Sequence, residues 1–351
     1  MKRGIAALVA LAIGYSSSVH ACSFHTYLPE MTVIDRLMMT ENVVLARPAA
    51  GDPFRFEAVE ALEGTLEQAD LPTLVDSSTR RRLAANPEDA VLFARDGGGY
   101  GPFMRLAYVD SGYRALLEEV MARKEDWIMG DDLARYQFFA DRLESEDQAI
   151  RGLALRELDR APYDIFQQLD MAPAAAPILQ ELWQIDQIPF VPIRILLLGR
   201  SGDAAAQESV IAGLERAKKD GGRYLGPLAV ALIELDGAGG VDRLVADYLS
   251  GQNDPGATES VVEALAIQAG AGDEALRTYI LETLRGFVHA FPQHADAVAR
   301  QFVLRYDYAM AEPLREVMTA GKIKSATDLI PVAAYVATSG EFSGAFGAVS
   351  E

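Results

Sequence analysis

Two residues suited to metal chemistry lie close together near the start of the chain. Cys22 is the only cysteine, and His25 follows three residues later. If the chain were cleaved after Ala21, the thiolate and the new α-amine of Cys22 would form a five-membered chelate. Thiolate and imidazole ligands suit copper or zinc, so Cys22 and His25 are a candidate site for either metal. Such a site needs a further ligand, and Met38 and Met39 are candidate thioether donors.

Two other interpretations of Cys22 stay open. In the first, the thiol is lipidated and anchors the chain to a membrane; Val19 and Ala21 fit a lipoprotein signal, whereas His20 does not. In the second, Cys22 packs as a small apolar residue and His25 makes a local hydrogen bond. The sequence does not decide between metal binding, lipidation and packing.

The segment before Cys22 has the pattern of a secretory signal. Lys2 and Arg3 form a positive start, and residues 4–15 form an apolar stretch that is too short to span a bilayer. Three serines and the run Val-His-Ala then lead to a cleavage site after Ala21. We therefore expect residues 1–21 to be a signal peptide, and the mature chain to work in the periplasm or elsewhere outside the cytoplasm.

Composition and charge exclude several function classes. The chain has 51 acidic and 32 basic residues and a formal net charge of −19. Such a surface repels phosphate backbones and anionic headgroups, so we expect no nucleic-acid partner, and membrane contact only through lipidation of Cys22. With a single cysteine, no disulfide can form within the chain, so packing must hold the fold together.

No motif for catalysis stands out. The sequence contains no nucleophile elbow, no paired-histidine zinc helix and no phosphate-binding loop. His289 and His294 flank a predicted helix boundary, where polar capping is their expected role. The basic run Arg80 to Arg82 is too small for a nucleic-acid surface and indicates a salt-bridge or docking spot. We therefore expect no catalytic residues and no enzyme.

The residues that follow Cys22 predict a small β domain over residues 22–112. A helical segment near residues 31–39 precedes five short strand-like runs with alternating apolar residues or bounding turn signals. These runs are residues 42–46, 54–62, 71–75, 90–94 and 103–109. Five strands in this space favour a β-barrel-like domain. Residues 113–130 are expected to form a connecting helix, with Trp127 and Tyr136 in the core where the two domains meet.

From residue 131 to 339 the apolar pattern has a helical period. Helices are predicted over residues 131–144 and 148–160, and later ones begin at Asp203, Asp254 and Asp273. Gly202, Gly239 and Gly272 mark similar helix junctions, 37 and then 33 residues apart. Helix pairs that repeat at this interval are typical of an α-solenoid. Residues 340–351 are expected to be a flexible tail.

Two family resemblances accompany these patterns. The apolar pattern over residues 147–159, together with the Leu-Gly-Arg-Ser-Gly-Asp stretch at residues 198–203, resembles HEAT-type helical repeats. A mature Cys22, a short helix, residues 41–47 and the run from 54 to Gly64 resemble the netrin-module and metalloproteinase-inhibitor family, which implies a five-stranded barrel. In that family the terminal cysteine is disulfide-bonded, and in the inhibitors it reaches a catalytic zinc. This chain lacks a partner cysteine, so the inhibitor activity is not implied.

These patterns predict an exported, non-enzymatic protein of the bacterial cell envelope that binds or scaffolds an unidentified protein partner. Extended solenoid surfaces serve protein–protein contact. The alternative prediction is a copper- or zinc-binding envelope protein that uses Cys22 and His25.

Overall fold

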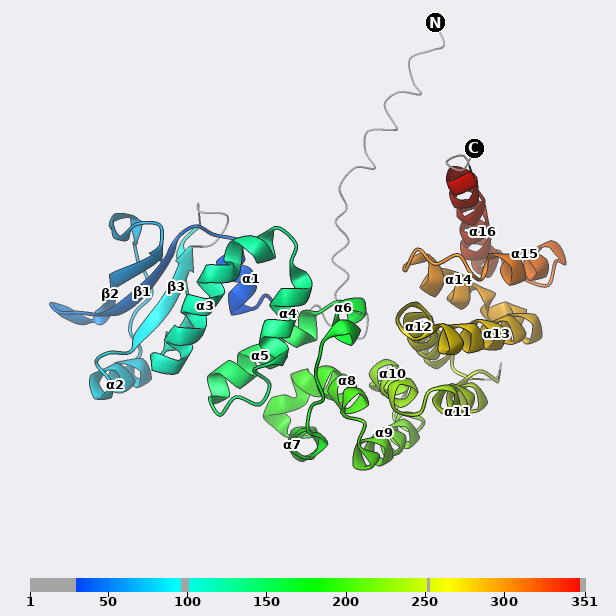
Figure 1. The fold of residues 1–351 in the computed structure, drawn as a ribbon, viewed down its shortest axis with the longest axis horizontal. Helices are drawn as coiled ribbons and strands as arrows, with labels where there is room; N and C mark the ends of the chain where they lie inside the picture. The colour runs from blue at the N-terminus through cyan, green and yellow to red at the C-terminus, as the bar shows by residue number, and fades with distance from the viewer. Residues whose placement is uncertain (1–29, 96–100, 251–252, 348–351) are drawn as a thin grey trace, which may run out of the picture.

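The computed structural model describes residues 30–95, 101–250 and 253–347. A small β-sheet lies at one end, and helices continue from it in an arc to the C-terminal helix at the other end (Figure 1). No helix within these described ranges combines the length and the apolar character needed to cross a membrane.

Four antiparallel strands form the sheet, preceded by a short helix. The helix α1 spans Val33–Met38, and Thr32 and Asp35 form a capping box at its start. The strands are β1 (Val43–Ala49), β2 (Asp52–Glu63), β3 (Ala90–Arg95) and β4 (Phe103–Val109). Their order in the sheet is β2-β1-β3-β4, so that β2 and β4 lie at opposite edges.

The predicted five-stranded barrel is not confirmed. Of the predicted strand at residues 71–75, only Leu74 forms a bridge, to Arg55 of β2. Asp76 follows at once and accepts hydrogen bonds from the amides of Ser78 and Thr79, which starts helix α2 (Ser77–Ala85). The chain therefore turns into a helix where a fifth strand would continue, and the sheet stays open.

The sheet packs against helices on both faces. Successive side chains of a strand point to opposite faces, and β3 follows this rule. Leu92 packs in the cluster that contains α1 and α3 (Ser111–Ile128), whereas Val91 and Phe93 pack in the cluster that contains Leu83 of α2. A single 3-10 turn, η1, spans Leu66–Gln68 after β2.

The core beneath the sheet continues into the helical region. Trp127 of α3 packs against Phe138 and Phe139 of α4 (Asp132–Ala140), with ring centroids 5.5 and 6.0 Å away. Leu153 of α5 (Gln148–Arg160) belongs to the same buried cluster. Both Trp127 and Tyr136 are buried, as predicted for the meeting point of the two regions.

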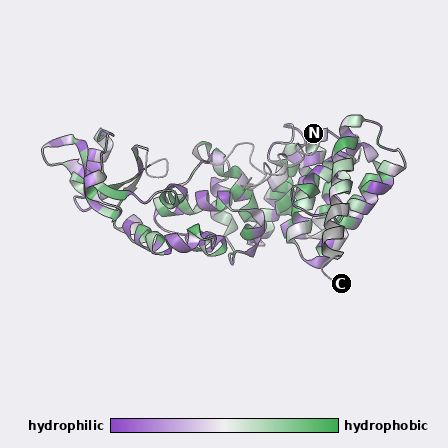
Figure 2. Ribbon diagram, turned by 90° about the horizontal axis from the view of Figure 1, so that it is seen from above, coloured by the Kyte–Doolittle hydropathy of each residue, from purple (hydrophilic) through white to green (hydrophobic). Residues whose placement is uncertain are grey.

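The remaining helices stack side by side in two layers. One layer holds α8, α10, α12, α14 and α16, and the outer layer of the arc holds α9, α11, α13 and α15 (Figure 1). Hydrophilic and hydrophobic residues alternate along these helices (Figure 2), as expected when each helix buries one face. The arrangement is compatible with a solenoid. The helices are α6 (Tyr163–Gln168), α7 (Ala175–Glu181), η2 (Ile185–Phe190), α8 (Val191–Ser201), α9 (Ala204–Ala217), α10 (Leu225–Asp236), α11 (Ala238–Tyr248), α12 (Pro255–Ala271), α13 (Glu274–Ala290), η3 (Pro292–His294), α14 (Ala295–Val303), α15 (Ala311–Thr319) and α16 (Ala326–Gly347).

The predicted helix starts in this region are confirmed. Asp203, Asp254 and Asp273 each accept a hydrogen bond from a backbone amide in the first turn of α9, α12 and α13. Gly202 ends α8 in a left-handed conformation, with a φ of +64°. Gly239 is not at a junction, because Gly237 ends α10 and Gly239 lies in the first turn of α11.

Close approach of neighbouring helices depends on small residues. A Cβ atom on Gly199 of α8 would lie 2.9 Å from the Cα of Ala231 in α10. A Cβ on Gly240 of α11 would lie 2.8 Å from the carbonyl oxygen of Leu232. Both contacts are shorter than van der Waals distance, so these two glycines set the spacing of α10 from its neighbours.

Buried charges tie α1 to the helical region. Arg135 of α4 donates to Asp35 of α1 at 2.8 Å and to Glu157 of α5 at 2.5 Å, and Arg160 reaches Asp35 at 2.8 Å. We call these four residues the joint ion cluster. The side chains of Arg135 and Glu157 are 6% and 0% exposed, so each charge depends on the others for compensation.

The two carboxylates of this cluster have pKa values shifted in opposite directions. Burial raises the pKa of Glu157, although the nearby Arg135 guanidinium opposes the shift. Burial also acts on Asp35, but hydrogen bonds from Arg135 and from the Thr32 amide outweigh it and lower the pKa of that carboxyl group.

Candidate functional site

The two residues predicted to bind metal, Cys22 and His25, lie outside the described residues. Of the candidate thioether donors, Met39 caps the C-terminus of α1 and is exposed, whereas Met38 is half-buried. Within the described part of the chain, no group of three or more histidine, cysteine, aspartate or glutamate side chains is placed to hold a metal ion.

One shallow depression gathers three methionines beside α1. Met31, Met39 and Met104 line it together with Arg36 and Arg95. The Arg36 guanidinium lies 3.5 Å from the Met104 sulfur. Thioethers are soft ligands for copper(I), but two guanidinium groups at the same place disfavour a cation.

A larger depression is a groove between α5, α7, η2 and α8, which we call the α5–α8 groove. Its volume is about 510 Å³, within the range of pockets that hold small ligands, about 300–1,000 Å³. Its lining combines guanidinium, carboxylate and amide groups with aliphatic and aromatic side chains. The lining residues are Leu143, Glu144, Gln148, Ala149, Arg151, Gly152, Leu155, Arg156, Pro173, Ala174, Pro177, Ile178, Glu181, Gln184, Gln187, Phe190, Arg194 and Leu197.

The groove exists because the chain leaves the helix stack between α5 and α8. Pro162 starts α6, which packs against α4 and α12 rather than beside α5. The side chain of Gln137 then holds the returning loop, donating to the Asp170 carbonyl at 3.1 Å and accepting from the Asp170 amide at 2.8 Å. Pro173 and Pro177 form part of the groove wall. The opening between α5 and α8 is therefore built by an interruption of the helix stack.

Three arginines with different partners line the groove. Arg194 is buried and donates to Glu181 and to Gln187, both at 2.8 Å, which fixes these side chains in the wall. Arg151 donates to the Ser145 carbonyl at 2.6 Å. The Arg156 guanidinium is exposed and lies 5.9 Å from the centroid of the Phe190 ring. Within the described residues, neither Arg151 nor Arg156 has a carboxylate partner.

Three apolar side chains are exposed in the segment that follows α7, and we call them the apolar rim. Ile185 is 87% exposed, and Trp183 and Ile188 are 46% and 40% exposed. All three lie in the segment that also supplies Gln184 and Gln187 to the lining. The Arg216 guanidinium stacks on Trp183 at 4.7 Å and supports the ring in its exposed position. This segment therefore lines the groove with Gln184 and Gln187 and exposes apolar side chains at the positions before, between and after them.

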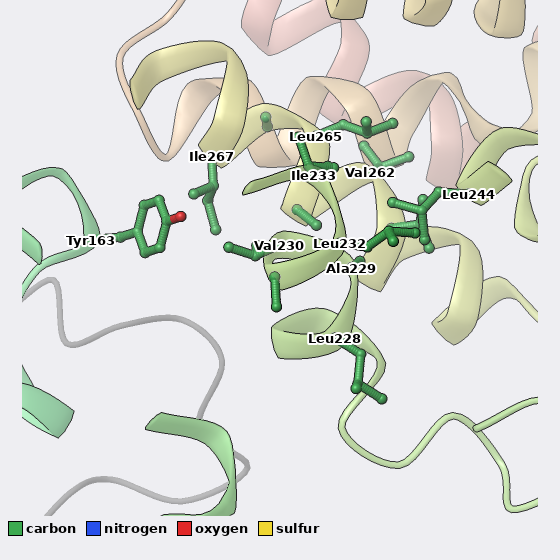
Figure 3. Close-up of a cluster of buried hydrophobic side chains, with 14 of the residues drawn as sticks. Tyr163, Leu228, Ala229, Val230, Leu232, Ile233, Leu244, Val262, Leu265 and Ile267 are labelled. Atoms are coloured by element: carbon green, nitrogen blue, oxygen red, sulfur yellow. The ribbon is translucent and has the colours of Figure 1, made fainter. Parts of the chain in front are cut away.

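A second polar cluster is enclosed by packing. Tyr163 of α6 donates to Glu234 of α10 at 2.6 Å, and Gln268 of α12 donates to both, at 2.9 and 3.0 Å. Gln167 also donates to Glu234, at 2.5 Å. Tyr163 points toward the apolar side chains of α10 and α12 (Figure 3).

Burial, followed by the Glu234 charge, raises the pKa of Tyr163 well above its usual value, so its phenol stays protonated and acts as a donor. Because its members satisfy one another's hydrogen bonds, this cluster holds α6 in place.

The other sequence candidates are dispersed. His289 bonds to the Arg285 carbonyl and to Glu316, at 2.8 and 2.9 Å, whereas His294 stacks on Phe287. The guanidinium groups of Arg80 and Arg82 stack on the rings of Phe54 and Tyr108, at 4.6 and 3.6 Å. The basic run thus packs on aromatic rings of the sheet.

No protein-family model matches this sequence, and comparisons with curated proteins and with solved structures returned no match to it. The resemblances to HEAT-type repeats and to the netrin-module family therefore stay predictions, and function must be inferred from the residues themselves.

Sequence reasoning missed the α5–α8 groove. The prolines at 173, 177, 189 and 192 are typical of an irregular helix array, and Pro173 and Pro177 line the groove. Proline clusters end helices but do not indicate which helices separate. The pairing of that signal with arginines at 151 and 156 could have pointed to the site.

Proposed function

We propose that this chain is an exported, non-enzymatic protein that binds a partner protein and holds it in the bacterial cell envelope. Export is inferred from the signal-like residues 1–21, and the binding role from the HEAT-like α-solenoid that we infer for the stacked helices. Stacked helices give an extended surface whose contacts are spread over many residues, which suits protein recognition.

The composition of the α5–α8 groove carries the proposal. Its described lining contains no serine, threonine, cysteine, histidine, lysine, tyrosine or aspartate. Of its two glutamates, Glu181 is bonded to Arg194. Nucleophilic or acid–base catalysis needs a nucleophile beside a base, or two titratable groups placed together. The groove instead offers hydrogen-bond donors and apolar surface, the groups that recognise a ligand.

Photo-crosslinking in the native host tests this function. A photoreactive benzoylphenylalanine in place of Gln148, at the groove, should give one adduct of defined mass with a partner protein. The same group in place of Glu208, which is exposed on α9, should not give that adduct. Adding Gly152→Leu should fill the groove and remove the adduct from the Gln148 position. An adduct that is absent, or that forms equally with Gly152→Leu, would contradict the proposal.

Metal binding through Cys22 and His25 is the second candidate function. It rests on the spacing of Cys22 and His25 in the sequence, because the guanidinium groups of Arg36 and Arg95 disfavour a cation in the depression lined by Met31, Met39 and Met104. Native mass spectrometry of the protein from its own host should then show one copper or zinc ion that Cys22→Ser removes. A native mass equal to the metal-free chain, or one raised by acyl groups on Cys22, would exclude this function.

A further inference from the structure

We propose that the α5–α8 groove takes an extended peptide segment of the partner that carries acidic side chains next to bulky apolar ones. This inference rests on the proposed function and adds the chemistry of the partner. It follows from the placement of cations, small residues and exposed apolar side chains around one opening.

Arg156 is the cation best placed to bind a ligand carboxylate. It makes no ion pair or hydrogen bond with any residue that the structure describes, and its side chain is exposed at the groove. Arg151 lies on the same helix, and its one described bond, to the Ser145 carbonyl, leaves its charge without a carboxylate partner. Guanidinium groups bind carboxylates through paired, charge-assisted hydrogen bonds. Two such groups therefore favour an acidic ligand.

Small residues on α5 give a ligand access to these cations. Ala149 and Gly152 both line the groove, and a Cβ atom on Gly152 would lie 3.7 Å from Nη2 of Arg156. A larger side chain at Gly152 would therefore fill the space beside the guanidinium. The glycine leaves room for a chain to lie against α5.

The apolar rim distinguishes a peptide from a small anion. Ile185 and Trp183 expose aliphatic and aromatic surface in the same segment whose Gln184 and Gln187 line the groove. A free phosphate or a small carboxylate would touch the guanidinium groups and leave this surface in water. A peptide with alternating side chains would place carboxylates on the arginines and apolar groups on the rim. Burial of that apolar surface adds binding free energy.

The net charge of the chain favours binding of an acidic ligand at the groove over binding elsewhere on the surface. The protein carries a formal charge of −19, so its surface as a whole repels acidic ligands. An acidic segment gains the most electrostatic binding free energy where the cations have no carboxylate partner within the protein and where carboxylates are few. In the groove, three arginines face two glutamates, one of which is bonded to Arg194.

Fluorescence polarisation with three labelled octapeptides tests the proposal on the full mature chain. One probe alternates aspartate with leucine, one lysine with leucine, and one aspartate with serine. We expect the aspartate–leucine probe to bind at least tenfold more tightly than either of the others. Arg156→Glu should remove this preference, whereas Arg315→Glu, an equal charge change at an exposed site on α15, should preserve it.

Two results would overturn the proposal. Equal affinity for the three probes would show that the groove does not distinguish acidic–apolar peptides from the others. Full displacement of the aspartate–leucine probe by inorganic phosphate, at a concentration similar to that of the probe, would show that the groove binds small anions in general. If either occurs while the Gln148 adduct still forms in the host, the proposed function stands and only the ligand chemistry is wrong. Loss of the adduct as well would mean that both fail.

Discussion

Replacing Arg135 by methionine lowers the free energy of unfolding by about 3–5 kcal/mol, the usual cost of removing one partner from a buried ion pair. Methionine keeps much of the volume and removes the charge. Glu157, whose side chain is fully buried, and Asp35 then lose the cation that both contact. Urea denaturation followed by circular dichroism gives the difference directly.

A matched change at an exposed ion pair serves as the control. Arg243 of α11 contacts Glu215 at 3.0 Å, and its side chain is 38% exposed. Arg243→Met should cost only about 0–1 kcal/mol, because solvent screens exposed pairs. A loss for Arg135→Met no greater than that for Arg243→Met would refute the role given to the joint ion cluster.

Trp127→Ala should destabilise the protein by about 3–5 kcal/mol, the range for removing a large aromatic side chain from a core. Trp127 is 3% exposed and contacts Phe138 and Phe139 between the sheet and the helices. The variant keeps Trp183, whose fluorescence reports on the groove. Urea unfolding followed by this fluorescence and by far-ultraviolet circular dichroism should shift by the same amount.

The shared core is the reason for that joint shift. A single buried cluster contains strand residues such as Leu92 and helix residues such as Leu153. Loss of the Trp127 side chain should therefore destabilise the sheet and the helices together. Leu133→Ala on α4 is the control, since Leu133 is 43% exposed and should change stability little. A shift seen by circular dichroism alone would show that the groove region unfolds independently of the sheet.

Local signals predicted local structure well. The run from 148 to 160 became α5 with the predicted ends, because Asp147 caps its first turn and its apolar residues keep a helical period. The aspartates at 203, 254 and 273 likewise capped helices as predicted. Such features depend on residues a few positions apart, which a single sequence displays.

Features that depend on distant residues could not be predicted. Arg135 and Asp35 are 100 residues apart, and nothing in either segment indicates the other. The fifth strand of the predicted barrel was not confirmed for a related reason, since a run such as residues 71–75 becomes a strand only if it can pair along its length with a neighbouring strand. The α5–α8 groove depends on where α6 packs, which is decided by α4 and α12.

The position of α6 also has a mechanical consequence. A stack in which each helix contacts only its neighbours bends easily, because small rotations between neighbouring helices add up along its length. Here Tyr163 joins α6 to α10 and α12 through Glu234 and Gln268, and α6 also rests on α4. We expect these contacts to limit changes of curvature from α4 to α12, so that bending of the arc should occur mainly in the helices beyond α12.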